Sequence, residues 1–172
     1  CIRSLKIQEE IKEKRGMGIL LNNIGDIYLK KGDVNQALDH FIRSFAIREK
    51  LGDKRGMSYS LHNMGVAYSF KGNNEKAVEY LEKSLNIQNS TGDHEGELLL
   101  DTTSILYLSY KRLGKKYDEK GINKLIRNKE NIEFEINYHL YLLLEDSSYL
   151  ETAYNQIQKK VNNFEPKIKT IF

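Results

Sequence analysis

The sequence predicts an all-α fold in which antiparallel helix hairpins stack into a solenoid. The first observation is an internal repeat with a constant offset. Lys-Arg-Gly-Met occupies both 14–17 and 54–57, and the segment 4–8 returns in similar form at 44–48 and 84–88. The second observation is that apolar residues in each half of a repeat recur at spacings of three and four, as on one face of a helix. A fixed period of this length is typical of architectures whose units pack only against their neighbours.

The composition narrows the class of protein. The chain has 172 residues, is 40% hydrophobic and 30% charged, and carries a net charge of +3, which is too small to indicate a nucleic-acid or membrane partner. The single cysteine, Cys1, excludes an internal disulfide framework and fits a reducing compartment, so we expect a cytoplasmic protein. The longest nearly apolar run, 138–144, is much shorter than the roughly 20 residues that span a bilayer. Because the chain does not begin with Met, we expect it to be part of a longer protein.

The first full repeat is predicted at 16–52 and consists of two amphipathic helices. Gly32 can adopt the positive φ that ends the first helix, and Asp33 is the expected N-cap of the second, with Gln36 completing a capping box. The apolar positions expected to form the first helix's stripe are Leu20, Leu21, Ile24, Ile27 and Tyr28, and those expected to be buried in the second are Ala37, Leu38, Phe41, Ile42, Phe45 and Ile47.

The second repeat, at 53–92, follows the same pattern, and the chain's beginning is interpreted from it. Residues 1–15 align with the end of a second helix, so they are expected to belong to a repeat whose first helix is missing. Lys12 stands where Gly52 and Gly92 stand. Either the turn at this point is tighter, or the helix is longer.

The pattern weakens after the second repeat. We predict a divergent repeat at 93–130, with a first helix that ends at Gly114 and a second at 117–127. A divergent hairpin at 131–164 has helices at 134–144 and 149–164, followed by a tail at 165–172 that contains the only proline, Pro166. Divergent terminal units are expected in such arrays, because they cap the stack.

The two regular repeats resemble the tetratricopeptide repeat (TPR), whose pattern is a large residue, a second large residue, Gly, Tyr, then Ala and a large residue. The pattern is met by Leu21, Ile24, Gly25, Tyr28, Ala37 and Phe41, and by Leu61, Met64, Gly65, Tyr68, Ala77 and Leu81. The period of 40 and the linker phrase at 52–57 look like the long-repeat subclass seen in kinesin light chains and in bacterial signalling proteins. The resemblance covers 17–92 strongly and the rest in part. It implies a right-handed superhelical solenoid whose concave groove binds a protein or peptide segment.

Nothing in the sequence points to catalysis. The four histidines are not at metal-ligand spacing, and no glycine-rich phosphate loop or Walker-type lysine is present. We therefore expect a protein that is not an enzyme and that carries neither a cofactor nor a metal.

The candidate binding residues are those predicted to face the groove. They are Asn22, Asn23, Asp26 and Lys30 in the first repeat and Tyr59, His62, Asn63 and Phe70 in the second. In the TPR resemblance, an asparagine such as Asn23 or Asn63 holds the backbone of an extended ligand, because an amide both donates and accepts hydrogen bonds. The alternative is that these asparagines bond to the neighbouring hairpin and fix the superhelix. Thr103 or Ile105 occupies the third position, so the ladder of amides has two members.

Three functions remain open from the sequence. The first is a protein–protein interaction module that serves as the scaffold or sensing part of a larger signalling protein. The second is an architectural module that self-associates through apolar residues of the incomplete repeat, such as Ile2, Leu5 and Ile7. The third is a regulatory domain of a linked enzyme such as a nucleotide cyclase or a histidine kinase. Two smaller expectations are that Arg15 and Arg55 brace the turns through carboxylates such as Asp53, and that the basic segment 115–131 is either a solvated face or a site for an acidic partner.

Overall fold

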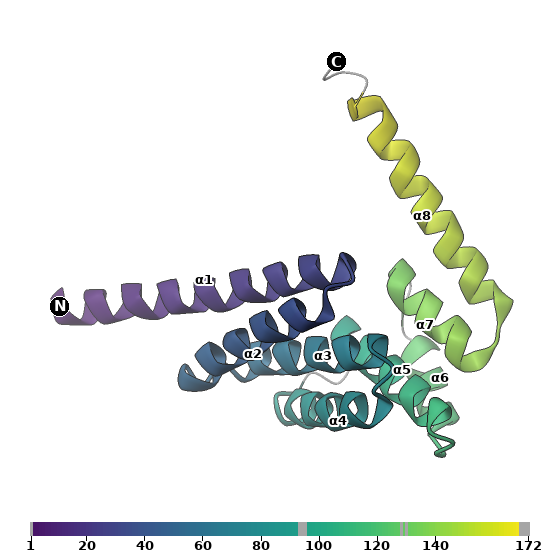
Figure 1. The fold of residues 1–172 in the computed structure, drawn as a ribbon, viewed down its shortest axis with the longest axis horizontal. Coiled ribbons are helices and arrows are strands. Elements are labelled where there is room, and N and C mark those ends of the chain that lie inside the picture. Colours follow the sequence, from purple (N-terminus) through teal and green to yellow (C-terminus); the bar gives the residue numbers. More distant parts are fainter. Residues whose placement is uncertain (1, 93–95, 128, 130, 169–172) are drawn as a thin grey trace.

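The computed structural model describes residues 2–92, 96–127, 129 and 131–168, and within these ranges the regular secondary structure is helical throughout (Figure 1). Cys1, residues 93–95 at the predicted start of the third repeat, and the last four residues of the predicted tail lie outside the described part. The helices are α1 (Ile2–Lys30), α2 (Val34–Lys50), α3 (Lys54–Phe70), α4 (Asn74–Ser90), α5 (Glu97–Arg112), α6 (Glu119–Arg127), α7 (Phe134–Leu144) and α8 (Ser147–Ile168).

The turns between α1 and α4 form where the sequence predicts them. Gly32, Gly52 and Gly72 each adopt a positive φ, between 66° and 83°, which permits a tight reversal after each helix. The next residue caps the following helix. The Asp33 side chain accepts a hydrogen bond from the backbone N–H of Gln36 at 3.2 Å, and the caps at 53 and 73 repeat this geometry. The helix–turn–helix prediction is therefore confirmed for this part.

The hairpins pack closely because small residues face large ones. A Cβ added to Gly25 would overlap the ring of Phe41, and a Cβ added to Gly65 would overlap Leu81. Ala37 and Ala77 are fully buried. The core of the described residues includes three apolar clusters along the stack, and each contains buried residues of at least two helices. This is the nearest-neighbour packing expected of a solenoid.

Three of the apolar positions predicted to be buried are exposed. Leu20 is 58% exposed and Ile27 is 54% exposed, on the outer side of α1, and Ile42 is 51% exposed on α2. The reason for the first two is positional. The corresponding residues of α3, Ser60 and Ala67, are fully buried between hairpins, whereas no hairpin within the described residues precedes α1.

The chain's first segment does not turn. α1 is one helix of 29 residues that runs through Lys12, so the longer-helix alternative is the one observed. Lys12 is a good helix former and lacks the freedom of glycine to adopt a positive φ. Lys14 and Glu10, one helical turn apart, form an ion pair at 2.7 Å across the same region. The N-terminal half of α1 consequently projects past the end of α2 (Figure 1).

The C-terminal half departs from the regular pattern. α6 has nine residues, and α5 packs against both α6 and α7. The turn after α7 has no glycine. Glu145 adopts φ 60° there, and the ammonium of Lys111 on α5 donates to the carbonyl oxygens of Leu142 and Leu143. These bonds satisfy the free end of α7 and tie it to α5.

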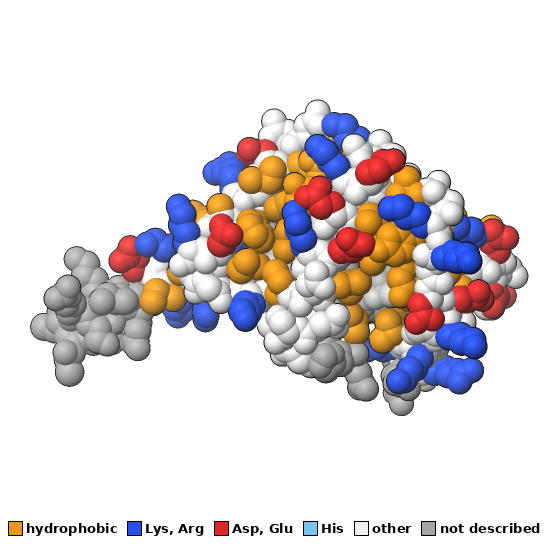
Figure 2. Space-filling view, turned by 90° about the horizontal axis from the view of Figure 1, so that it is seen from below, with side chains coloured by type: hydrophobic (Ala, Val, Ile, Leu, Met, Phe, Trp, Pro, Cys, Tyr) orange, Lys and Arg blue, Asp and Glu red, His pale blue; other side chains and the backbone are white. Residues whose placement is uncertain are grey.

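The last helix is longer than predicted. α8 continues to Ile168, so Pro166 lies within the helix rather than beyond it, and the predicted tail from 165 begins as helix. Ala153 of α8 is buried. α8 extends away from the stack of α1–α4 (Figure 1). On the face seen from below, basic and acidic side chains are interspersed, with apolar patches between them (Figure 2).

Candidate functional site

A cavity of about 710 Å³ opens on the side of the solenoid that the first helices of the hairpins share. α1, α3 and α5 line it, and the start of α7 closes one side. Seven of the eight residues predicted to face the groove line this cavity: Asn22, Asn23, Asp26, Lys30, Tyr59, His62 and Asn63. The repeat register therefore identified most of the two walls that α1 and α3 form.

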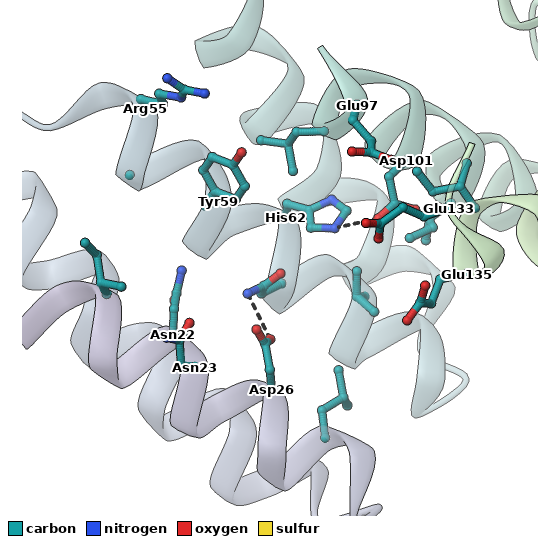
Figure 3. Close-up of a pocket in the computed structure, with 18 of the residues that line it drawn as sticks. Asn22, Asn23, Asp26, Arg55, Tyr59, His62, Glu97, Asp101, Glu133 and Glu135 are labelled. Carbon is teal, nitrogen blue, oxygen red and sulfur yellow. Dashed lines mark hydrogen bonds and ion pairs between the residues drawn. The ribbon is translucent and has the colours of Figure 1, made fainter. Parts of the chain in front are cut away.

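Asn63 spans two hairpins. Its side-chain amide on α3 donates a hydrogen bond to Asp26 Oδ1 on α1 at 3.1 Å (Figure 3). Burial raises the pKa of Asp26, against the opposing charges of Lys30 and His62. The second amide hydrogen and the side-chain oxygen of Asn63 can form further hydrogen bonds, for example to a ligand.

Asn23 holds the equivalent place in the first repeat and is exposed to the cavity. Among the described residues, no hydrogen bond engages its side chain. The third repeat has no amide at the equivalent position, for which the candidates are Thr103 and Ile105. The hydroxyl of Thr103 donates a hydrogen bond to the carbonyl oxygen of Leu99 in its own helix, and the apolar side chain of Ile105 lines the cavity. Asn23 is thus the more available of the two amides.

Asn22 and His62, which share one repeat position, lie deeper. Asn22 is 6% exposed, and its side-chain oxygen accepts a hydrogen bond from the hydroxyl of Ser60 at 3.2 Å. His62 is 5% exposed, with Nδ1 2.9 Å from Thr102 Oγ1. Both side chains reach the cavity wall while they join one hairpin to the next.

Asp101 on α5 connects three helices. His62 Nε2 on α3 lies 3.2 Å from Asp101 Oδ2, and His139 Nδ1 on α7 lies 3.2 Å from Asp101 Oδ1. Burial alone would raise the pKa of Asp101, but hydrogen bonds from His139 and His62, together with their charges, outweigh burial and hold this pKa well below its ordinary value. The carboxylate form is therefore the one that ties the wall together.

The wall beside Asp101 is acidic. Glu97 on α5 and Glu133 and Glu135 around the start of α7 line the same side, and Figure 3 shows them grouped around Asp101, across the cavity from α1. The oxygen Oε2 of Glu135 is buried without a hydrogen-bond partner. The repeat pattern did not predict these residues, because α7 folds onto α5 outside the regular register.

The basic residues of the cavity are fewer, and one is already paired. Arg48 Nη1 lies 3.6 Å from Asp53 Oδ2, in the turn between α2 and α3. Arg48 is buried, burial lowers its pKa, and its Nε donates to Ser44 Oγ at 3.1 Å. The turn is thus braced by Arg48 and not by Arg55, which sequence reasoning had expected. Arg55 lines the cavity together with Lys30.

The two aromatic residues predicted to face the groove differ in where they lie. Tyr59 lines the cavity and is 39% exposed. Phe70, at the end of α3, is 67% exposed and lies outside the residues that line this cavity. The basic segment after α5 is also away from it, with Lys115, Lys116, Lys120, Lys124 and Arg127 exposed.

The described residues include no group of three or more His, Cys, Asp and Glu side chains placed to hold a metal ion. A helix both long and apolar enough to cross a membrane does not occur in this part of the chain either.

A solenoid of antiparallel helix hairpins with a groove along its first helices is the class of fold that the structure defines. The family model of the tetratricopeptide repeat matches residues 16–90. No curated protein matches the chain significantly.

The solved structures that share this fold include the following two. The TPR domain of Arabidopsis FLU is 17% identical and superposes with a TM-score of 0.56, covering 67% of this chain and 92% of that one. A putative kinesin light chain from Podospora anserina, described as having nearly identical TPR-like repeats, is 22% identical with a TM-score of 0.54, covering 83% of this chain and 69% of that one. The predicted all-α, TPR-like solenoid is confirmed.

Proposed function

We propose that the chain is a protein–protein interaction module that holds a segment of a partner protein in the cavity along α1, α3 and α5. The observation that carries this proposal is the cavity itself, about 710 Å³, open to solvent and lined by side chains at the same positions of successive repeats. TPR folds are in general modules for protein–protein interaction, and repeat solenoids use such extended concave surfaces for binding. In a longer signalling protein, such a module would serve as the scaffold or sensing part.

The partner segment contacts both polar and apolar groups of the cavity. Asn23 offers an unengaged amide for a peptide backbone, and Tyr59 offers an aromatic surface beside it. The constant 40-residue spacing of these positions supports a place in the long-repeat subclass. The partner's backbone is recognised by the amide and its side chains by the surrounding wall.

The charge of the cavity selects a cationic segment. Five carboxylates line it apart from Asp53, which pairs with Arg48; they are Asp26, Glu97, Asp101, Glu133 and Glu135. Their basic counterparts are Lys30 and Arg55. A lysine or arginine of the partner that reaches the wall of α5 and α7 would complete this arrangement, since electrostatic complementarity sets specificity at interfaces.

Binding of a fluorescent peptide library tests this function. The library contains peptides with a central Lys or Arg and matched peptides with Glu at the same place. We expect the cationic set to bind, and Asn23→Ala to weaken the hits about tenfold, which corresponds to the loss of one or two hydrogen bonds. The matched control is Asn86→Ala, an exposed asparagine on α4 outside the cavity. Equal affinities of the two variants for every hit would contradict binding of the partner segment in the cavity.

A further inference from the structure

Arg48 of α2 is a buried cation that reaches the cavity with unused hydrogen-bond donors. Its side chain is 9% exposed and lines the cavity at the turn between α2 and α3. Nε donates to Ser44 Oγ at 3.1 Å, and Nη1 lies 3.6 Å from Asp53 Oδ2, which is too far for a hydrogen bond. Among the described residues, no other polar group bonds to this guanidinium. A buried charge in this state is costly unless a partner supplies acceptors.

The packing of the repeats does not need this charge. The second repeat has Gln88 at the same position, and Gln88 is 1% exposed. Its Nε2 donates to Ser84 Oγ at 2.9 Å, as Arg48 Nε donates to Ser44 Oγ. In both repeats the serine hydroxyl then donates to a backbone carbonyl of the preceding helix. A neutral donor is therefore sufficient for the structural bond, and the charge of Arg48 is left for another role.

The ion pair with Asp53 does not neutralise this part of the cavity. Oδ1 of Asp53 accepts a hydrogen bond from the N–H of Gly56 at 3.0 Å as the N-cap of α3, and Oδ2 is the atom near Arg48. Arg55 is exposed and lines the cavity at the same turn. Two guanidinium groups, of Arg48 and Arg55, thus stand against one carboxylate, and this end of the cavity has an excess of positive charge.

The opposite charge lies across the same cavity. Figure 3 shows Arg55 at one side, Tyr59 and then His62 further along α3, and a group of carboxylates beyond His62. These carboxylates form the acidic wall, which consists of Glu97, Asp101, Glu133 and Glu135. From Arg55 to His62 the axis of α3 rises by about 10 Å. An extended segment covers that distance with about three residues, so one short segment can meet both charges.

We propose that Arg48 and Arg55 form a carboxylate-binding subsite, so that the partner segment carries an acidic side chain about three residues from the basic one that the acidic wall selects. The inference rests on the proposed function and adds a second recognition element to it. A guanidinium presents paired N–H donors that match the two oxygens of a carboxylate. Asp53 makes a doubly charged phosphate less favourable here than a singly charged carboxylate. Two opposite charges at a fixed spacing also set the register of the segment in the cavity.

Titration of fluorescent peptides into the 172-residue chain tests the subsite. The peptides have a central Lys and a Glu three residues before or after it, and matched peptides have Gln in place of the Glu. We expect one Glu set to bind the wild type about tenfold more tightly than its Gln counterparts. Arg48→Gln, which introduces the residue of the second repeat, should abolish this preference. The matched control is Arg43→Gln, an exposed arginine of α2 that pairs with Asp39 outside the cavity, and it should keep the preference.

A charge exchange at Arg55 tests the same subsite through its exposed member. Arg55→Glu should reverse the preference, so that peptides with Lys at the place of the Glu bind more tightly than the Glu peptides. An arginine with a purely structural role would not produce this reversal. Circular dichroism verifies that each variant keeps the helicity of the wild type, and the Arg55 variant serves alone where Arg48→Gln unfolds the chain.

The outcomes separate this subsite from the proposed function. Equal affinities of the Glu and Gln peptides for the wild type would overturn the subsite, and the proposed function would stand where the central Lys is still required and Asn23→Ala still weakens binding. A preference for Glu that survives in both arginine variants would also overturn the subsite. No binding by any peptide, or binding that Asn23→Ala, Arg48→Gln and Arg55→Glu all leave unchanged, would overturn both.

Discussion

The regular part of the solenoid, α1–α4, and the divergent part, α5–α8, differ in how their helices are positioned. In the regular part, each turn has a glycine with positive φ and each following helix has a side-chain cap. In the divergent part, the N-cap residues of α5 and α7, Gly96 and Glu133, make no side-chain capping bond, and α6 is nine residues long. Yet the divergent part supplies most of the carboxylates of the cavity. The repeat builds the frame, and the departure from the repeat sets the charge of the site.

The largest expected effect concerns the cores of the two parts. Phe41→Ala should lower the free energy of unfolding by about 3–5 kcal/mol, because it empties a fully buried ring site between two hairpins. Ile122→Ala, its counterpart in the divergent core, should cost about 2–5 kcal/mol. Urea denaturation measures both, with Ile42→Ala as the exposed control within about 0.5 kcal/mol of wild type. A neutral Ile122→Ala would mean that α6 is not part of the core.

Gly16 and Gly56 occupy equivalent positions in the regular part but have different surroundings. A Cβ added to Gly56 would overlap the buried Arg48 side chain, whereas a Cβ added to Gly16 meets nothing within 4 Å. We expect Gly56→Ala to destabilise by about 1–3 kcal/mol through overpacking, and Gly16→Ala to stabilise by about 0.5–1 kcal/mol through helix propensity. Thermal unfolding of the two variants should show opposite signs. The same sign for both would contradict the bracing role of Arg48.

Asp101 gives the divergent part a specific pH dependence. Its pKa is lower in the folded chain than in the unfolded one, so its contribution is complete above the unfolded pKa of about 3.9 and is lost as the pH falls through the folded pKa. Asp101→Asn should therefore cost about 1–3 kcal/mol at pH 6, and the difference from wild type should shrink below about pH 4. Asp39→Asn, in an exposed pair with Arg43, is the control and should change stability by less than about 1 kcal/mol. A pH-independent effect of Asp101→Asn would contradict the bridge to the two histidines.

The smallest expected effects concern the helix caps. Asn73→Ala should cost about 1 kcal/mol, because it removes the side-chain acceptor for the N–H of Lys76. Gly96→Ser should stabilise α5 by a few tenths of a kcal/mol, because Gly96 already has the extended backbone of an N-cap and lacks only the side-chain acceptor. Hydrogen exchange at the first turn of each helix measures both changes locally. No change at α5 would show that the start of this helix is limited by something other than its cap.

The sequence predicted the regular part well because its determinants are local. Gly32 and Asp33 specify a turn and a cap without reference to the rest of the chain, and the 40-residue register places Asn23 and Tyr59 on the same side. Exposure at Leu20 was mispredicted because it depends on the neighbour of α1 and not on the periodicity of α1. The role of Arg48 in stabilising the turn between α2 and α3 was not predicted. Its side chain fits there because Gly56, eight residues later and in another helix, has no Cβ to occupy the same space.

The acidic wall was beyond sequence reasoning for a different reason. Glu133 and Glu135 stand more than 30 residues from Glu97 and Asp101 and outside the repeat register, so their proximity depends on how α7 folds onto α5. That packing depends on non-local contacts: the apolar cluster that α5, α6 and α7 share, the bonds of Lys111 to the end of α7, and the pair formed by His139 and Asp101.

We propose that the divergent part makes the cavity select a cationic segment, and one comparison of affinities tests this selectivity most directly. The cationic hits of the peptide library are titrated into the wild type and into Glu97→Gln/Glu133→Gln, with Glu119→Gln/Glu151→Gln as a control that removes two exposed carboxylates from α6 and α8. We predict a loss of affinity of about tenfold or more for the first double variant, a small change for the control, and a loss that diminishes at high salt. Equal binding by the wild type and both double variants would contradict the account.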